Sequence, residues 1–412
     1  MATYPTAIKS FTNPLATDFL SSPAHATQHT QENDEINAIE TELGTVVRGT
    51  YSSLVLRLND VPGTAAYFIN AANHTSLQAA INAGSASGGA VFLPAGTYNI
   101  GTQLEMYSNM TLFGVGPASV IRATASMVGM LHGTAIGTIS VHDIQFDGND
   151  TAKNGIWMEN ISYYDFSHNF FHDIGTTTED SNGCIDYWGH HGVVANNNIR
   201  DTNGSCRGIF ITAGSSFEIA VIGNVFDNCW NGIVSDDGAH HFVIDGNSIS
   251  NSRAIGIAIS TVGSITVSNN TLYWNSPSAT SLGISVAGNA TTQNKDVIVA
   301  NNNMNLNRSG GGANGAITLH YLTNVSVTGN VVKNGSALGG IFADNCLDVV
   351  ITGNRCFDDL GTKAQAYGLY LTGSTDYCAI IGNNFRGNLT GGISAGTGTN
   401  NVGTGAGYNI TA

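Results

Sequence analysis

Apolar and polar residues alternate in short runs along most of this chain, and the runs recur at a regular interval. Within each interval an apolar residue is followed by two further residues, an asparagine, one more residue and then another apolar residue. The asparagines are Asn169, Asn197, Asn224, Asn247, Asn270, Asn302, Asn330, Asn354 and Asn383. Their spacings are 28, 27, 23, 23, 32, 28, 24 and 29 residues, and periods of this length indicate stacked structural repeats.

A second motif, a glycine followed by an aliphatic residue, recurs in phase with the asparagines. Alternation such as Ile209-Phe210-Ile211 predicts strands with one buried face, so each repeat holds at least two short strands. Helical repeats fit poorly because their units run to roughly 33–47 residues. The pattern predicts an all-β solenoid of about 11–12 turns, because a single turn cannot bury its apolar face alone.

The asparagines are expected to superimpose at one corner of this coil. Asparagine tolerates a left-handed backbone, and its amide can bond to the amide of the next turn. We therefore interpret the asparagines as structural.

The first 69 residues have a different pattern. Three prolines break the early part, Ala26 to Gly44 is predicted to form a helix, and a second amphipathic segment runs from Tyr51 to Val61. The two narrow apolar stripes suit oligomerisation or attachment to a partner. Packing against the first coil is an equally good interpretation.

The segment that enters the solenoid carries a recognisable signature. An amphipathic helix is expected over about 76–83, followed by Gly88-Gly89-Ala90-Val91-Phe92-Leu93-Pro94-Ala95-Gly96-Thr97-Tyr98. With the repeats, this resembles the right-handed, single-stranded parallel β-helix of the pectate-lyase-like superfamily over residues 70–412, with Ile144 taking the asparagine position in an early turn. The resemblance implies that the helix caps the first coil.

The leader, 1–69, starts with "YPTAIKSFTNP" and contains "NDEINAIETELGT". It resembles the leaders of bacteriophage structural and tail-associated proteins. That resemblance implies a tailspike or tail-fibre protein: a homotrimer that contacts tail or baseplate proteins through its N-terminus and binds, and often cleaves, surface polysaccharide. A location in the virion or outside the cell is expected.

The amino-acid composition limits which classes of partner and cofactor are compatible with this chain. The formal net charge is -15, which opposes binding to nucleic acid. No stretch is long and apolar enough for a membrane span, and the N-terminus lacks a signal-peptide pattern. The six cysteines lack paired spacing and are expected to be buried free thiols. No cofactor is required, although calcium bound by aspartates could bridge to an anionic glycan.

Counting back from the asparagines aligns a group of ionisable residues on three successive turns. Asp186 and Asp236 lie eleven positions before Asn197 and Asn247. His191, Glu218 and His241 lie six positions before three successive asparagines. These five are the candidate catalytic residues. The expected substrate-binding residues are Trp157, Trp188, His190, Phe210, Asp237 and His240.

Paired carboxyls predict hydrolysis of glycosidic bonds. Two turns would place the backbones of Asp186 and Asp236 about 9.6 Å apart, near the separation of an inverting enzyme. Glu159, one turn before Asp186, would instead give about 5 Å and a retaining enzyme. The histidine and acidic motifs occur in the reverse of the polygalacturonase order, so only the idea of carboxylate hydrolysis is carried over from that family.

Three other interpretations stay open. A β-eliminating lyase would use Arg200, Arg207 or Arg253 to neutralise a uronate. Zinc bound by His191, Glu218 and His241 has acceptable ligand types but an awkward spacing. The protein could also be an adhesin or structural spike that cleaves nothing.

Overall fold

The computed structural model describes the solenoid almost completely and the leader in part. The described residues are 29–30, 32–34, 36–37, 68–85, 89–176, 182–212, 216–261, 263–273, 282–288, 294–305, 314–335, 337–405 and 407–411. Contacts divide the chain into units 1–62 and 63–412. The described leader residues are helical and lie within the segment 26–44. The rest of that helix and the segment 51–61 lie outside the described residues.

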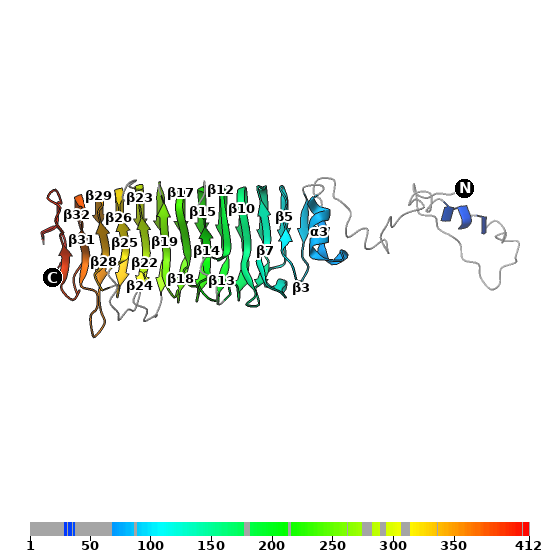
Figure 1. The fold of residues 1–412 in the computed structure, drawn as a ribbon, viewed down its shortest axis with the longest axis horizontal. Helices are drawn as coiled ribbons and strands as arrows, with labels where there is room; N and C mark the ends of the chain where they lie inside the picture. Colours follow the sequence, from blue (N-terminus) through cyan, green and yellow to red (C-terminus); the bar gives the residue numbers. More distant parts are fainter. Residues whose placement is uncertain are drawn as a thin grey trace, which may run out of the picture. The chain divides into compact units, whose positions relative to one another are not determined.

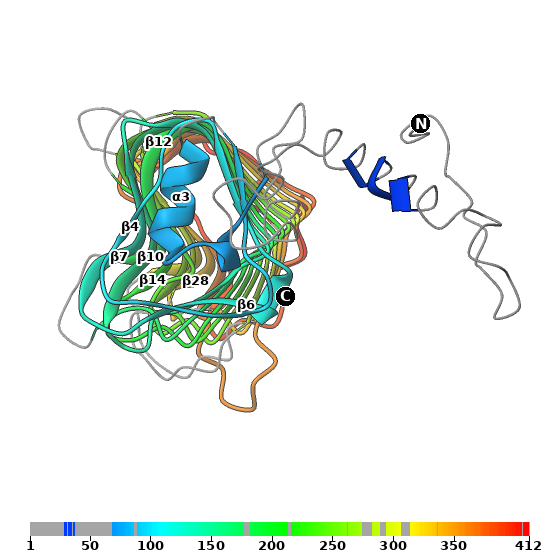
Figure 2. The same cartoon turned by 90° about the vertical axis from the view of Figure 1, so that its right-hand side faces the viewer.

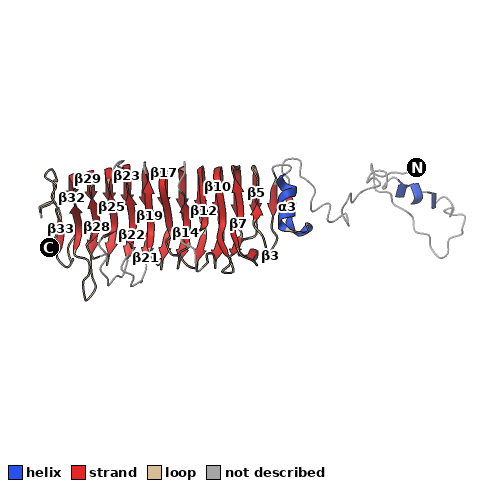
Figure 3. Cartoon of the chain, viewed as in Figure 1, coloured by secondary structure: helices blue, strands red, loops and turns tan. Residues whose placement is uncertain are grey.

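The second unit is a parallel β-helix, which confirms the predicted fold class (Figures 1 and 3). Its first sheet has 22 strands. They are β1 (Phe68–Asn70), β2 (Ala90–Phe92), β4 (Leu104–Glu105), β5 (Met110–Phe113), β7 (Met127–Thr134), β8 (Gly137–His142), β10 (Ala152–Ser167), β12 (Gly183–Ala195), β14 (Arg207–Ile211), β15 (Phe217–Ile222), β17 (Ile233–Asp245), β19 (Ile255–Thr261), β20 (Ile265–Ser268), β22 (Leu282–Ala287), β23 (Asn294–Ala300), β25 (Gly315–His320), β26 (Leu322–Thr328), β28 (Gly339–Asp344), β29 (Leu347–Thr352), β31 (Tyr367–Thr372), β32 (Asp376–Ile381) and β33 (Gly391–Ser394).

The second sheet has 11 strands, which agrees with the number of turns expected from the repeats. They are β3 (Gly96–Ile100), β6 (Ser119–Ala123), β9 (Gln145–Asp147), β11 (Phe170–His172), β13 (Asn198–Arg200), β16 (Val225–Asp227), β18 (Ser248–Ser250), β21 (Thr271–Tyr273), β24 (Asn303–Asn305), β27 (Val331–Lys333) and β30 (Arg355–Phe357). Two short 3-10 helices are η1 (Ala71–Asn73) and η2 (Gly116–Ala118).

The core fills the inside of the coil with stacked aliphatic side chains. One inward column consists of fully buried residues paired in register from turn to turn: Ile185, Ile209, Ile233, Ile257, Ile284, Ile317, Ile341 and Leu369. Helix α3 (Leu77–Ser85) closes the first coil with buried Leu77, Ala80 and Ile81, and Figure 2 shows it across the end of the coil. The sequence places its capping helix at about the same residues.

The asparagines form a continuous ladder. In each step the backbone N–H and the side-chain amide of one asparagine donate to Oδ1 of the next, as from Asn197 to Asn224 at 3.0 and 2.9 Å. Asn409 extends the ladder beyond the last predicted asparagine, and the backbone N–H of Ile144 donates to Asn169 at its start. These bonds confirm the structural interpretation.

One detail of the ladder was predicted wrongly. The left-handed residue is the one before each ladder asparagine, for example Asn196 (φ 55°), Gly223 (φ 66°) and Gly246 (φ 65°). The corner therefore turns one residue earlier, and each asparagine itself points its amide along the stack.

The six cysteines are free and buried, as the sequence predicts. Burial raises the pKa of the Cys346 and Cys378 thiols to about 12, which makes them poor nucleophiles. None of the helices in the described part of the chain is long and apolar enough to cross a membrane.

Candidate active site

One outward column of the 22-stranded sheet brings the candidate site together. Residues at the same position of successive turns pair in register, and their neighbours along each strand point into the core, so their side chains point outward. This outer column consists of Glu105, His132, Trp157, Asp186, Phe210, Val234, Ala258, Ser285, Thr318, Phe342, Tyr370 and Ser394. Three residues predicted from sequence, Trp157, Asp186 and Phe210, are consecutive members.

Asp186 is the most unusual ionisable group of the outer column. Its side chain is buried at 6% exposure, between Trp157 and Phe210 on the adjacent strands. Burial raises the pKa of Asp186 to about 7; Arg207 opposes this rise, while Asp236 and Glu159 add to it. A carboxyl that titrates near neutrality can hold its proton and release it during a reaction.

Arg207 lies beside this carboxyl. Its guanidinium carbon is 4.1 Å from the centroid of the Phe210 ring, a cation–π contact. Its Nε and Nη1 atoms are buried and have no hydrogen-bond partner among the described residues. Buried donors without a partner are costly, so this guanidinium has unused capacity to bind an acceptor.

Four polar side chains on the strands before Asp186 contact one another: Glu105, His132, Thr134 and Glu159. Of these, Glu159 alone was identified from the sequence. Nδ1 of His132 is 2.7 Å from Oε2 of Glu105, and its Nε2 is 3.8 Å from Oε2 of Glu159. Thr134 donates to Glu159 at 3.2 Å. The His132 ring packs on Trp157 with centroids 4.5 Å apart. Glu105 and His132 precede the first ladder asparagine, and the sequence candidates were counted back from asparagines alone.

The two predicted carboxyl spacings were wrong. Glu159 pairs in register with Trp188 and is one strand and two residues away from Asp186, a backbone separation of about 8 Å rather than 5 Å. Val234, not Asp236, shares the outer column with Asp186. Asp236 lies two turns and two residues away from Asp186, which separates the backbones of the two residues by about 12 Å. The side chain of Asp237 lies outside the described residues.

The predicted histidines form a second cluster with Glu218 and Phe217, which begins four positions beyond Asp186 along β12. Trp188 lies between the two groups and pairs in register with Glu159. His190, Phe217 and His240 pair in register, and their rings stack with centroids 4.8 and 5.4 Å apart. Nδ1 of His190 is 2.6 Å from Nδ1 of His191, and the same atoms of His240 and His241 are 2.7 Å apart.

This histidine cluster is separate from Asp186. His190 lies four residues beyond Asp186 in β12, about 13 Å along the strand. The pKa of His240 is lowered by burial and by His241, with Glu218 opposing. His191, Glu218 and His241 have φ values of 57°, 54° and 57°, so the position six residues before the ladder is a left-handed bend. The prediction that a single face gathers all these residues is therefore wrong.

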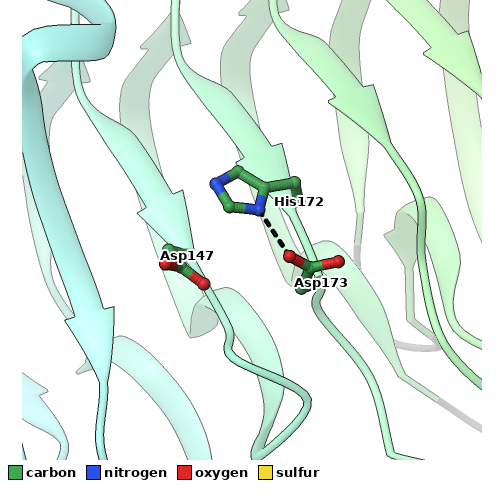
Figure 4. Close-up of side chains that lie close together, drawn as sticks. All are labelled: Asp147, His172 and Asp173. Carbon is green, nitrogen blue, oxygen red and sulfur yellow. Dashed lines mark hydrogen bonds and ion pairs between the residues drawn. The ribbon is translucent and has the colours of Figure 1, made fainter.

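The predicted zinc ligands do not form a compact set. His191 Nε2 is 2.7 Å from Glu218 Oε2, but His241 contacts His240 instead. Among the described residues, the cluster with ligand atoms close enough for a metal is Asp147, His172 and Asp173, on the other sheet (Figure 4). There His172 already contacts Asp173 and Gln145, and Arg122 lies 3.4 Å from Asp147, so a cation would compete with existing partners.

The fold recurs in solved structures. The A-module of mannuronan C-5 epimerase AlgE4 from Azotobacter vinelandii is similar with a TM-score of 0.61 at 16% identity, covering 82% of this chain and 100% of that one. DFA-IIIase from Arthrobacter chlorophenolicus A6 in complex with GF2 is similar with a TM-score of 0.54 at 14% identity, covering 76% of this chain and 93% of that one. The adhesin PfbA of Streptococcus pneumoniae is similar with a TM-score of 0.50 at 14% identity, covering 72% of this chain and 95% of that one. At these identities the likeness establishes a shared fold.

Sequence comparison places the chain in a family. No curated protein matches the sequence. The family model described as a right-handed beta helix region matches residues 115–272 and 207–385, which together span more than half of the 412-residue chain. The chain belongs to the right-handed beta helix family.

Proposed function

We propose that this protein hydrolyses a polysaccharide on the outer face of the β-helix, around Asp186. The observation that carries the proposal is a buried carboxyl, with a pKa raised to about 7, between two aromatic side chains. Aromatic rings offer flat surfaces to sugar rings, and a neutral carboxyl can donate a proton to a glycosidic oxygen. Folds similar to this one include an epimerase that acts on mannuronan and a bacterial adhesin.

The two carboxyls have complementary roles in this mechanism. Asp186 donates its proton to the oxygen of the leaving sugar as the glycosidic bond breaks. The carboxylate of Glu159 takes a proton from a water molecule, whose oxygen bonds to the anomeric carbon from the opposite face. The two backbones lie about 8 Å apart, which leaves room for a water molecule between the outward side chains. Inversion, in which the carboxyl groups themselves lie roughly 6.5–9.5 Å apart, is therefore the expected outcome.

Glu159→Gln is expected to slow the release of reducing ends at least about 100-fold, because an amide cannot accept the proton of water. The same change should lower the pKa of Asp186, since the negative charge of Glu159 helps to raise it. Asp236→Asn, measured in parallel, tests the alternative base. If Glu159→Gln keeps its activity and Asp236→Asn loses it, the roles assigned to these two carboxyls are wrong.

The activity itself is tested on a panel of bacterial capsules, O-antigens, pectin and alginate. New reducing ends without ultraviolet absorbance indicate hydrolysis. Reducing ends with absorbance indicate β-elimination, and binding without either indicates an adhesin. Either of the last two outcomes would overturn the proposed hydrolase.

Arg207 favours β-elimination as the second candidate. Its unpaired Nε and Nη1 atoms lie near Asp186 and could receive the carboxylate of a uronate. His132, two strands from Asp186 on the outer column, supplies a group able to remove a proton. The net charge of -15 disfavours acidic polymers, which ranks this candidate below hydrolysis.

The assignment to a phage tail rests on the leader sequence alone. We propose that residues 1–69 attach a trimeric β-helix to the virion, where the protein binds host polysaccharide. Deletion of residues 1–60 is expected to lower the molecular mass measured by light scattering from a trimer to a monomer. An unchanged oligomeric state would exclude the leader as the trimerisation element.

A further inference from the structure

The outer column carries a second group of aromatic residues, far from Asp186. Phe342 and Tyr370 are adjacent members, and their rings stack with centroids 5.9 Å apart and an interplanar angle of 8°. Tyr367 adds a third ring, 5.5 Å from that of Tyr370. Beside them Nδ1 of His320 is 3.2 Å from Oδ2 of Asp344. Aromatic surface and hydrogen-bonding groups therefore lie together at this end of the column.

The members of the outer column between the two groups are uncharged, and none is aromatic. From Phe210 to Phe342 the outer column passes only Val234, Ala258, Ser285 and Thr318. Five strand spacings give about 24 Å between the two phenylalanines. No bulky side chain of this column interrupts a polymer that runs along the coil, so one extended chain could contact both groups.

The tyrosines are placed for contact with a ligand. Phe342 is 5% exposed and forms the base of the group, whereas Tyr367 and Tyr370 are half-buried. Tyr367 pairs in register with Gly339 on one side and Gly391 on the other, so neither residue in register with it carries a side chain. The core does not use these tyrosines, because Ile341 and Leu369 fill the inward positions of the same strands.

We propose that Tyr367 and Tyr370, with His320 and Asp344, form a distal glycan-binding platform. It holds the same polysaccharide chain that is cleaved at Asp186, and thus rests on the proposed function. Six strand spacings from Asp186 to Phe342 correspond to about 29 Å, so the platform engages a polymer of several sugar units and not a short fragment. Sugar rings pack on the tyrosines while the His320–Asp344 pair bonds to hydroxyl groups.

The platform is tested by native gel electrophoresis in gels that contain alginate, polygalacturonate, inulin, dextran or a bacterial capsular polysaccharide. We expect at least one polymer to retard the full-length protein. The double variant Tyr367→Ala, Tyr370→Ala should bind that polymer about tenfold more weakly, a loss of about 1.4 kcal/mol. Tyr273→Ala, which removes an exposed tyrosine from the other sheet, is the matched control and should bind normally.

Two further measurements separate the platform from the catalytic site and from misfolding. The variant Tyr367→Phe, Tyr370→Phe keeps the rings and should retain most of the binding. Asp186→Asn should be retarded like the natural protein, whether or not the polymer is hydrolysed. Equal retardation of the alanine double variant and the natural protein overturns the platform, as does the lack of retardation by every polymer. The absence of new reducing ends overturns the hydrolase alone.

Discussion

Asp186→Asn is expected to reduce the release of reducing ends by a factor of roughly 10²–10⁴, because the amide cannot donate the proton that the leaving sugar requires. The same substitution should stabilise the protein at alkaline pH. Initial rates at pH 6 and thermal melting at pH 5 and pH 8 measure the two effects.

The sign of the stability effect follows from the pKa of Asp186. In the unfolded chain this carboxyl ionises near 3.8, whereas in the folded protein it keeps its proton up to about 7. Between these values the folded state binds more protons than the unfolded state, so stability falls as the pH rises. The loss is complete above pH 7 and amounts to about 4 kcal/mol. Asparagine does not titrate and avoids this loss.

The control for this experiment is Asp165→Asn, which changes an exposed aspartate in β10. It should alter neither the rate nor the pH dependence of melting. Full activity of Asp186→Asn would contradict the role of this residue as the acid. An Asp186→Asn protein that is no more stable than the natural protein at pH 8 would contradict the raised pKa.

Asn224→Ala is expected to lower the free energy of unfolding by roughly 4 kcal/mol, because it breaks the ladder at its centre. Oδ1 of Asn224 accepts two hydrogen bonds from Asn197, and its Nδ2 donates to the carbonyl of Val194 and to Asn247. The alanine leaves these buried groups unpaired, and each costs about 1–3 kcal/mol. Urea denaturation followed by circular dichroism measures the loss.

Asn99→Ala is the matched control for the ladder, because this asparagine is exposed and its backbone is not left-handed. Its effect should stay within about 0.5 kcal/mol. If Asn224→Ala were as mild as Asn99→Ala, the ladder would not be a principal source of stability.

The fold could be predicted from sequence because the ladder imposes one asparagine on every turn from Asn169 onward. The histidine cluster could be aligned in the same way, since His190, Phe217 and His240 each lie seven residues before their own asparagine. Few residues separate this cluster from the ladder, and their number does not vary.

The outer column could not be aligned by that count. Asp186 precedes its asparagine by 11 residues, whereas Phe210 and Val234, its partners in register, precede theirs by 14 and 13. Extra residues at the intervening corner change the count without changing the strand pairing. Asp236 was therefore aligned with Asp186 although it lies two residues beyond the column. His132 lies twelve residues before Ile144, as Trp157 lies twelve before Asn169, so a count from the Ile144 position could have found it.

The most direct test of the proposed site is a crystal structure of the Asp186→Asn variant with an oligosaccharide of the polymer that the natural protein cleaves. We expect the sugar rings to lie along the outer column and to contact Trp157 and Phe210. A glycosidic oxygen should then lie within about 2.6–3.2 Å of the substituted side chain at position 186. An oligosaccharide bound at the histidine cluster, or on the 11-stranded sheet, would contradict the proposed site.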